Sequence, residues 1–202
     1  MDRVVTSREA TTRGIPRRWN TAHKETTRAA MTMKPRLRKF ALAAHLTFSV
    51  GWIGTVIAYL ALGVAAVASD ETSTVRSAWT AMELIGWYVI VPLALASLAT
   101  GLVMAFGTKW GLFRYYWVTI SFVLTVFATV ILLLHMPSVT TTADIAQRSS
   151  GAALEALGGD LGHPAIGLVV LLAVQVLNIY KPPGMTRYGW RKQQEQRAPS
   201  DA

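Results

Sequence analysis

The chain has 202 residues, of which 52% are hydrophobic and only 15% are charged, and its formal net charge is +9. This composition is too apolar for an average soluble domain and is typical of a small helical membrane protein. The absence of cysteine excludes disulfides, thiolate metal sites and thiol catalysis, so redox chemistry would need a bound cofactor.

Residues 1–34 are polar, basic and rich in threonine, and we expect them to be disordered. The motif "PRRWN" is not followed closely enough by a hydrophobic run to predict a twin-arginine signal. The segment "MTMKPRLRKF" already supplies a basic flank for a first span, so Met31 and Met33 are alternative start sites.

Four charge-free runs follow, at residues 40–69, 84–108, 115–143 and 161–180. Each reaches the roughly 20 apolar residues that cross a hydrocarbon core, and in lipid a helix satisfies its own backbone hydrogen bonds. The sequence therefore predicts an all-α, four-transmembrane-helix bundle within residues 35–182. Its spans are expected at about 39–68, 80–107, 114–137 and 162–181, with a basic tail over 183–202.

The distribution of charge predicts an orientation. Of the 20 Lys and Arg residues, 18 lie in the N-terminal segment, the connection between the second and third spans, and the C-terminal tail. The positive-inside rule then places both termini in the cytoplasm, for a multi-pass protein of the inner (plasma) membrane. The remaining connections carry Arg76 and Arg148 among five acidic residues, namely Asp70, Glu71, Asp144, Glu155 and Asp160.

The first span has one face suited to packing against other helices. His45 lies about 9 Å inside the predicted cytoplasmic boundary, since it follows Lys39 by six residues. The residues that share this face with His45 by heptad spacing are polar, aromatic or small, which is typical of a helix–helix contact. The face comprises His45, Ser49, Trp52, Val56, Tyr59, Gly63 and Ala66.

The second span contains a carboxylate and a proline. Glu83 lies near the predicted outer start, where a carboxylate is costly and indicates a partner or a function. No further acidic residue follows it within the span, which disfavours a transporter built on a carboxylate relay. Pro92 predicts a kink, because it removes the hydrogen bond to the Tyr88 carbonyl, and Ser97 with Gly101 predicts close helix approach.

A candidate ligand set lies in one predicted outer layer, formed by Glu83, His135, Met136 and His163. Such donors suit a borderline or soft metal such as copper, and haem b held by His135 and His163 is a second alternative. His45 is a further candidate cofactor-binding residue, but it lies near the opposite side of the membrane, so one haem shared by His45 and His135 is not expected.

The structural alternative assigns no chemistry to these histidines. In that interpretation His135 and His163 are interfacial residues, Pro137 ends the third helix, and Pro164 occupies the first turn of the fourth. The tail "YKPPGMTRYGWRKQQEQR" indicates contact with anionic lipid headgroups rather than with nucleic acid. No Gly-rich phosphate loop, HExxH, nucleophile elbow or kinase signature is present, so an enzyme is not expected.

Several segments carry a resemblance: "HLTFSVGWIG", "AMELIGWYVIVPLALASLATGLVMAFGTKWGLFRYYWV", "ILLLHMP" and "NIYKPPGMTRYGWRK". Together they resemble small four-helix predicted integral membrane proteins of unknown function, common in actinobacteria. More distantly, His45, Gly51, Trp52 and Gly54 are similar to the copper-resistance D type of membrane protein, which implies copper transport or haem binding. The basic residue often found early in the third span of that type is missing from "WVTISFVLT".

We therefore expect a non-catalytic accessory or interaction subunit that contacts lipid and either a membrane-protein partner or a second copy of itself. The alternative is a haem- or copper-binding membrane protein with an outer-side histidine site.

Overall fold

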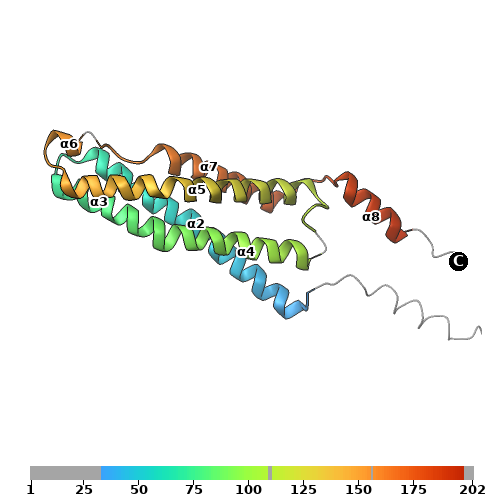
Figure 1. Ribbon diagram of the computed structural model, residues 1–202. Coiled ribbons are helices and arrows are strands. Elements are labelled where there is room, and N and C mark those ends of the chain that lie inside the picture. Colours follow the sequence, from blue (N-terminus) through green and yellow to red (C-terminus); the bar gives the residue numbers. More distant parts are fainter. Residues whose placement is uncertain (1–32, 109–110, 156, 198–202) are drawn as a thin grey trace, which may run out of the picture. The chain divides into compact units, whose positions relative to one another are not determined.

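The structure is a computed structural model that describes residues 33–108, 111–155 and 157–197 (Figure 1). The described residues form helices and no strand, apart from one isolated β-bridge between Tyr115 and Met185. The predicted disorder of residues 1–34 lies outside the described residues, except for its last two positions.

Four helices are long and apolar enough to cross a membrane, which confirms the prediction of an all-α protein with four candidate spans. The first is α2 (Pro35–Ala68), and the third and fourth are α5 (Tyr116–Arg148) and α7 (Gly162–Tyr180). The second is one run made of α3 (Thr72–Ile85), the π-helix η2 (Gly86–Ile90) and α4 (Val91–Gly107). A short α6 (Ala152–Glu155) precedes α7, and α8 (Arg187–Arg197) follows it.

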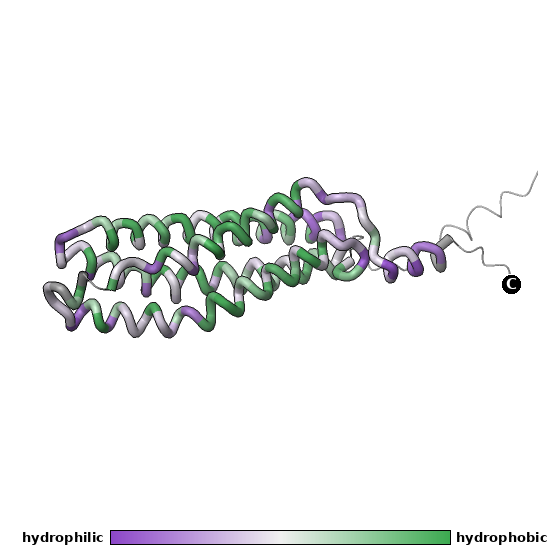
Figure 2. The backbone as a smooth tube through the Cα atoms, turned by 90° about the horizontal axis from the view of Figure 1, so that it is seen from above, coloured by the Kyte–Doolittle hydropathy of each residue, from purple (hydrophilic) through white to green (hydrophobic). Residues whose placement is uncertain are grey.

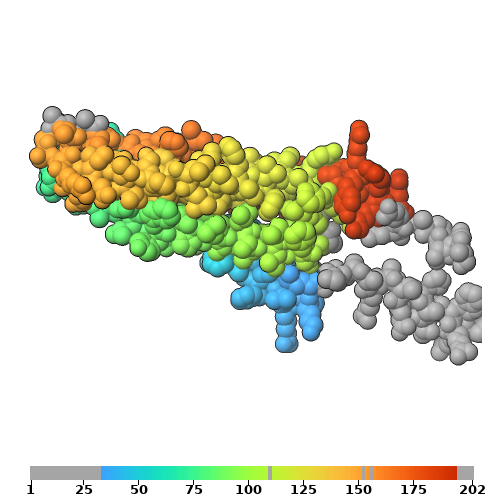
Figure 3. Space-filling model, in the orientation of Figure 1, coloured from blue at the N-terminus to red at the C-terminus, as the bar shows by residue number. Residues whose placement is uncertain are grey.

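The two ends of this bundle differ in charge. The acidic end holds the α2–α3 and α5–α7 connections, with Asp70, Glu71 and Asp160. The basic end holds the start of α2, the α4–α5 connection and the end of α7, and its basic residues include Arg38 and Lys39. Figure 2 shows that hydrophobic residues dominate the helices between these ends. Neighbouring helices pack side by side, as α4 and α5 do along the face seen in Figure 3.

The buried face of α2 is the one predicted from its heptad pattern: Trp52, Val56, Tyr59, Gly63 and Ala66 are buried. They pack with buried residues of α3 and α5 into one hydrophobic core, whose other members include Val75, Trp79, Met82, Met136, Val139 and Ala143. The small and aromatic residues of this face therefore serve helix packing, as expected for a face turned away from lipid.

The irregularity predicted at Pro92 takes the form of a π turn just ahead of it. The Val91 N–H donates to the Gly86 carbonyl, one residue further back than in an α-helix. Proline has no N–H, and its ring clashes with the carbonyl four residues earlier, so a widened turn keeps the span continuous. Gly86 also provides space for Met136, because a Cβ there would lie 2.5 Å from the Met136 methyl carbon.

The prediction that Pro137 ends the third helix is wrong, since α5 continues through Pro137 to Arg148. Beyond the proline, Val139, Ala143 and Ala146 are buried against the bundle. The Arg76 guanidinium on α3 donates to the carbonyls of Ala146 and Ser149 at the end of α5. This packing outweighs the one backbone hydrogen bond that a proline removes, and tertiary contacts commonly sustain a proline within a membrane helix.

Candidate metal centre

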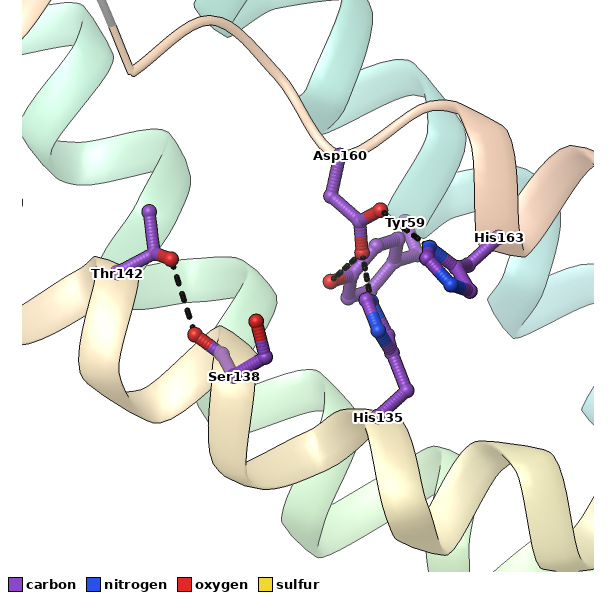
Figure 4. Close-up of polar contacts among 6 residues, drawn as sticks. All are labelled: Tyr59, His135, Ser138, Thr142, Asp160 and His163. Carbon is purple, nitrogen blue, oxygen red and sulfur yellow. Dashed lines mark hydrogen bonds and ion pairs between the residues drawn. The ribbon is translucent and has the colours of Figure 1, made fainter.

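A cluster of polar side chains lies at the acidic end, where α2, α5 and the start of α7 meet (Figure 4). His135 comes from α5, Asp160 from the connection before α7, His163 from the first turn of α7, and Tyr59 from the buried face of α2. Figure 4 shows both imidazoles and the phenol directed toward the Asp160 carboxylate. These four residues are called the histidine cluster below.

The Asp160 carboxylate is the centre of the cluster. Its Oδ2 accepts hydrogen bonds from His135 Nε2 at 2.6 Å and from the Tyr59 hydroxyl at 2.9 Å. Its Oδ1 lies 3.8 Å from His163 Nδ1. The two imidazole rings are stacked, with centroids 4.0 Å apart and an interplanar angle of 22°. One donor atom from each of His135, Asp160 and His163 therefore lies within 4.8 Å of the others.

Burial of the cluster is graded. The Asp160 side chain is 9% exposed and that of His135 is 18% exposed, whereas that of His163 is 61% exposed. A carboxylate removed from water needs hydrogen-bonding or charged partners, which Tyr59 and His135 provide. An adjoining cavity of about 190 Å³ reaches the cluster between α2, α5 and α7. The cluster is thus assembled inside the protein and open to its surroundings on the His163 side.

Close backbone contacts hold the connection that carries Asp160. Trp79 on α3 donates from its indole N–H to the Gly158 carbonyl at 3.2 Å. A Cβ on Gly63 of α2 would lie 3.0 Å from the Asp160 carbonyl oxygen and 2.9 Å from Leu161. Gly159 approaches the Gly63 carbonyl so closely that its own Cβ would collide with it. The two glycines permit this approach because they have no side chain, and they position Asp160 over Tyr59.

The predicted ligands are only partly brought together. His135 and His163 meet, as the sequence suggested. Met136 is buried, and its sulfur and methyl group pack against Gly86 of η2. Glu83, on α3, is half-buried and does not belong to the His135–Asp160–His163 group, the single such group among the described residues. The candidate set of Glu83 and Met136 with two histidines is therefore replaced by a set containing Asp160.

His45 lies elsewhere. Its Nδ1 donates to the Ser97 carbonyl and lies 3.1 Å from the Thr100 hydroxyl on α4. Tyr59 follows His45 by 14 positions on the same helix, which separates them by about 21 Å along its axis. His45 therefore takes no part in the histidine cluster, in agreement with the expectation that no single haem joins His45 and His135.

A haem ligated by both His135 and His163 does not fit this arrangement. Two axial imidazoles bind one haem iron from opposite faces, with the porphyrin between them. Rings stacked with centroids 4.0 Å apart leave no space for a macrocycle. The alternative that His135 and His163 together hold haem b is therefore incompatible with the observed stacking of the two rings.

A single metal ion suits the three donors better. Zn²⁺ binds imidazole nitrogen and carboxylate oxygen at about 2.0–2.2 Å, so two donors to one tetrahedral ion lie roughly 3.3 Å apart. The observed separations of 2.6 Å and 3.8 Å lie on either side of that value. Without a sulfur donor, a set of two imidazoles and one carboxylate suits Zn²⁺ or Cu²⁺ rather than Cu⁺.

Sequence reasoning missed Asp160, which it treated only as one of five acidic residues in the connections. The available signal was the spacing in "DLGH", in which Asp160 precedes His163 by three residues at the start of a predicted span. It also missed the role of Tyr59, because nothing in the pattern of α2 indicates which loop its hydroxyl contacts.

Comparisons with protein-family models, with curated proteins and with solved structures find no match to this chain. The resemblance to the copper-resistance D type thus stays a prediction that depends on His45, Gly51, Trp52 and Gly54 of the first span.

Proposed function

We propose that this protein is a multi-pass membrane protein that binds one divalent transition-metal ion, Zn²⁺ or Cu²⁺, at His135, Asp160 and His163. The observation that carries the proposal is the convergence of three donor atoms within 4.8 Å, one from α5 and two from the start of α7 and the residues just before it. Tyr59 would orient the carboxylate, a role that partners outside the ligand set commonly have at metal sites. The function is binding and handling of the ion, since no catalytic motif accompanies the site.

The charge of the two ends supports a location for this site. Lys and Arg concentrate at the basic end, so the positive-inside rule assigns both termini to the cytoplasm and the histidine cluster to the outer side of the inner membrane. Because the chain has no native cysteine, single cysteines report topology directly. We expect Ser150→Cys to react with a membrane-impermeant maleimide in intact cells. Lys34→Cys should react only after the cells are lysed. The reverse pattern would contradict this orientation.

The metal proposal is tested by titration of purified protein. After chelator treatment in mild detergent, equilibrium dialysis against Zn²⁺ or Cu²⁺ with elemental analysis should show one bound ion per chain. His163→Gln is the most informative variant, because this exposed side chain can be replaced without disturbing the core. We expect its affinity to fall at least about 100-fold, because one of three protein ligands is lost and even partners outside the ligand set typically contribute 10–100-fold.

His45→Gln is the matched control, a histidine of the same bundle that lies outside the cluster. It should bind the ion as the unmodified protein does. Sub-stoichiometric binding by the unmodified protein, or an equal loss in the two variants, would contradict the proposal.

A second candidate function, that of a non-catalytic accessory or interaction subunit, is favoured by the exposure of α7. Leu171 is its one buried residue, whereas six residues of α2 are buried. Most of α7 is therefore open to lipid, a protein partner or a second copy of the chain. Extraction in a gentle detergent should then recover a stoichiometric partner or a homodimer, and recovery of a lone monomer alone would count against this function.

A further inference from the structure

A second polar region lies toward the basic end, away from the histidine cluster. Here α2, α4, α5 and α7 surround an open cleft of about 520 Å³, called the basic cleft below. This volume is within the range of roughly 300–1,000 Å³ typical of small-molecule sites. Polar residues from all four helices line it, among them His45, Ser49, Ser97, Ser121, Gln175 and Asn178.

The charge of the basic cleft has one sign. Arg38, Lys39 and Lys181 line it, and none of the acidic residues that the structure describes does. Within the described part of the chain, no carboxylate lies within ion-pair distance of Arg38 or Lys39. A cleft with cationic groups and low-dielectric walls concentrates positive potential, so its charge is complementary to an anion.

One hydroxyl that lines the cleft has no hydrogen-bond partner in the part of the chain that the structure describes. Ser121 is only 6% exposed, and its Oγ makes no hydrogen bond within the described residues. Two hydroxyls further along α5, those of Thr125 and Thr129, instead donate to backbone carbonyls one turn back. Because buried polar groups in folded proteins are nearly always satisfied, the Ser121 hydroxyl indicates a missing polar partner.

The walls of the cleft are apolar. They include Leu46 of α2, Phe122 of α5 and the indole rings of Trp52 and Trp117. On α2 the lining extends from Arg38 to Ile53, which is about 22 Å along the helix axis and well into its apolar part. The cleft therefore combines cationic groups at its rim, hydroxyls and amides below them, and hydrocarbon walls. This combination is complementary to a molecule that has an anionic head and an apolar chain.

We propose that the basic cleft binds a phosphate-ester anion, with Arg38 and Lys39 pairing with the phosphate and the Ser121 hydroxyl bonding to the adjoining polar atoms. The ligand that satisfies all three features is an anionic phospholipid, whose acyl chain lies against the apolar walls. A free phosphate ester shares the head chemistry but makes no use of those walls.

The proposal is tested by native mass spectrometry. The protein is reconstituted with phosphatidylcholine and increasing amounts of phosphatidylglycerol, and a chelator is added so that metal binding at the histidine cluster does not affect the result. The double variant Arg38→Gln/Lys39→Gln should bind phosphatidylglycerol at least tenfold more weakly than the unmodified chain. The matched control is Lys34→Gln/Arg36→Gln, which removes the same charge from the same segment at residues that do not line the cleft.

Ser121→Leu adds a test that changes no charge. It fills the cleft and removes the unpartnered hydroxyl, so it should also weaken binding severalfold, whereas Ala58→Leu, at an exposed position outside the cleft, should not. Equal losses in the two double variants would show general surface attraction and overturn the proposal. Unchanged binding by Ser121→Leu would overturn it as well.

Calorimetry with glycerol 3-phosphate in discs of phosphatidylcholine alone distinguishes the two sources of the anion. Binding that is lost in Arg38→Gln/Lys39→Gln supports the proposal and shows that the head is sufficient. Absence of this binding, with phosphatidylglycerol retained, supports the proposal and identifies the lipid as the ligand. Failure of both ligands to bind would overturn it.

Discussion

The two polar regions of the bundle differ in how their groups are satisfied. In the histidine cluster the polar atoms face one another: Asp160 receives hydrogen bonds from both Tyr59 and His135, and His163 stacks on His135. In the basic cleft the polar atoms surround a space: His45 and Ser49 bond to Ser97, but the Ser121 hydroxyl has no partner among the described residues. One region is assembled before any ligand arrives, and the other is a cleft that a ligand would complete.

The chemistry of the groups accounts for this difference. A buried carboxylate without partners costs several kcal/mol, so Asp160 must be paired within the protein itself. A neutral hydroxyl left unpaired costs only about 1–3 kcal/mol, which a folded protein tolerates. A substitution at the acidic end should therefore also affect the other residues of the hydrogen-bonded histidine cluster, whereas a substitution at the basic end should have a local effect.

The largest effect is expected from Gly63→Leu, which changes no ligand. Its side chain would meet Leu161 and the backbone of Asp160, so the connection that carries the carboxylate must move away from α2. We expect metal affinity to fall at least about 100-fold and the protein to lose roughly 1–3 kcal/mol of stability, as measured by dialysis and by denaturation.

The comparison variant for this prediction is Gly54→Leu, on the same helix, where a Cβ would meet no atom within 4 Å. It should leave metal affinity unchanged and should not lower stability, because leucine is a better helix former than glycine. If Gly63→Leu bound metal normally, the close approach of α2 to the connection would have no part in placing Asp160.

Tyr59→Phe should have an intermediate effect. The change removes the hydroxyl that donates to Asp160 Oδ2 and retains the buried ring. Metal affinity should fall about tenfold, as is typical for partners outside the ligand set, while phospholipid binding at the other end stays the same. Tyr88→Phe, at a residue that is 76% exposed, should change neither property. Equal metal affinities for the two variants would show that the network is not coupled.

Ser49→Ala tests the basic end with a smaller expected effect. The Ser49 and Ser97 hydroxyls lie 2.8 Å apart between α2 and α4. Hydrogen bonds between membrane helices contribute about 0.6 kcal/mol on average, so reversible unfolding should show a loss of that order, without change in metal affinity. A loss of several kcal/mol would mean that this end is as tightly coupled as the histidine cluster.

The smallest effect concerns Glu71, at the acidic end but outside the histidine cluster. Hydrogen bonds from the Ser73 hydroxyl, and then from Thr74, lower the pKa of this exposed carboxyl. Its contribution to stability is therefore present above the unfolded-state pKa and is lost as the pH falls through the lower folded-state pKa. Carboxyl ¹³C NMR should detect this low pKa, and Glu71→Gln should remove the small pH dependence at acidic pH. A titration of Glu71 at its ordinary value would contradict these contacts.

The buried face of α2 and the pair of histidines were predictable, because residues spaced by heptads share a helix face and two predicted span ends lie in one layer. The interpretation of Met136 failed for a local reason. Adjacent residues on a helix point in different directions, so the neighbour of His135 packs against Gly86 instead of joining the cluster. Asp160 could have been inferred from its spacing to His163, but not its contact with Tyr59, 101 residues earlier in the chain.

The sequence by itself determined the four apolar helices and the unequal charge of the two ends, because the length of an apolar run and the position of a charge are local properties of the chain. Only the tertiary structure decided that α5 continues beyond Pro137 and that Asp160 meets His135, His163 and Tyr59. The physical reason is packing. The contacts of Gly63 with Gly159 and of Trp79 with Gly158 place the connection against α2 and α3, and no local pattern specifies which backbone a glycine will touch.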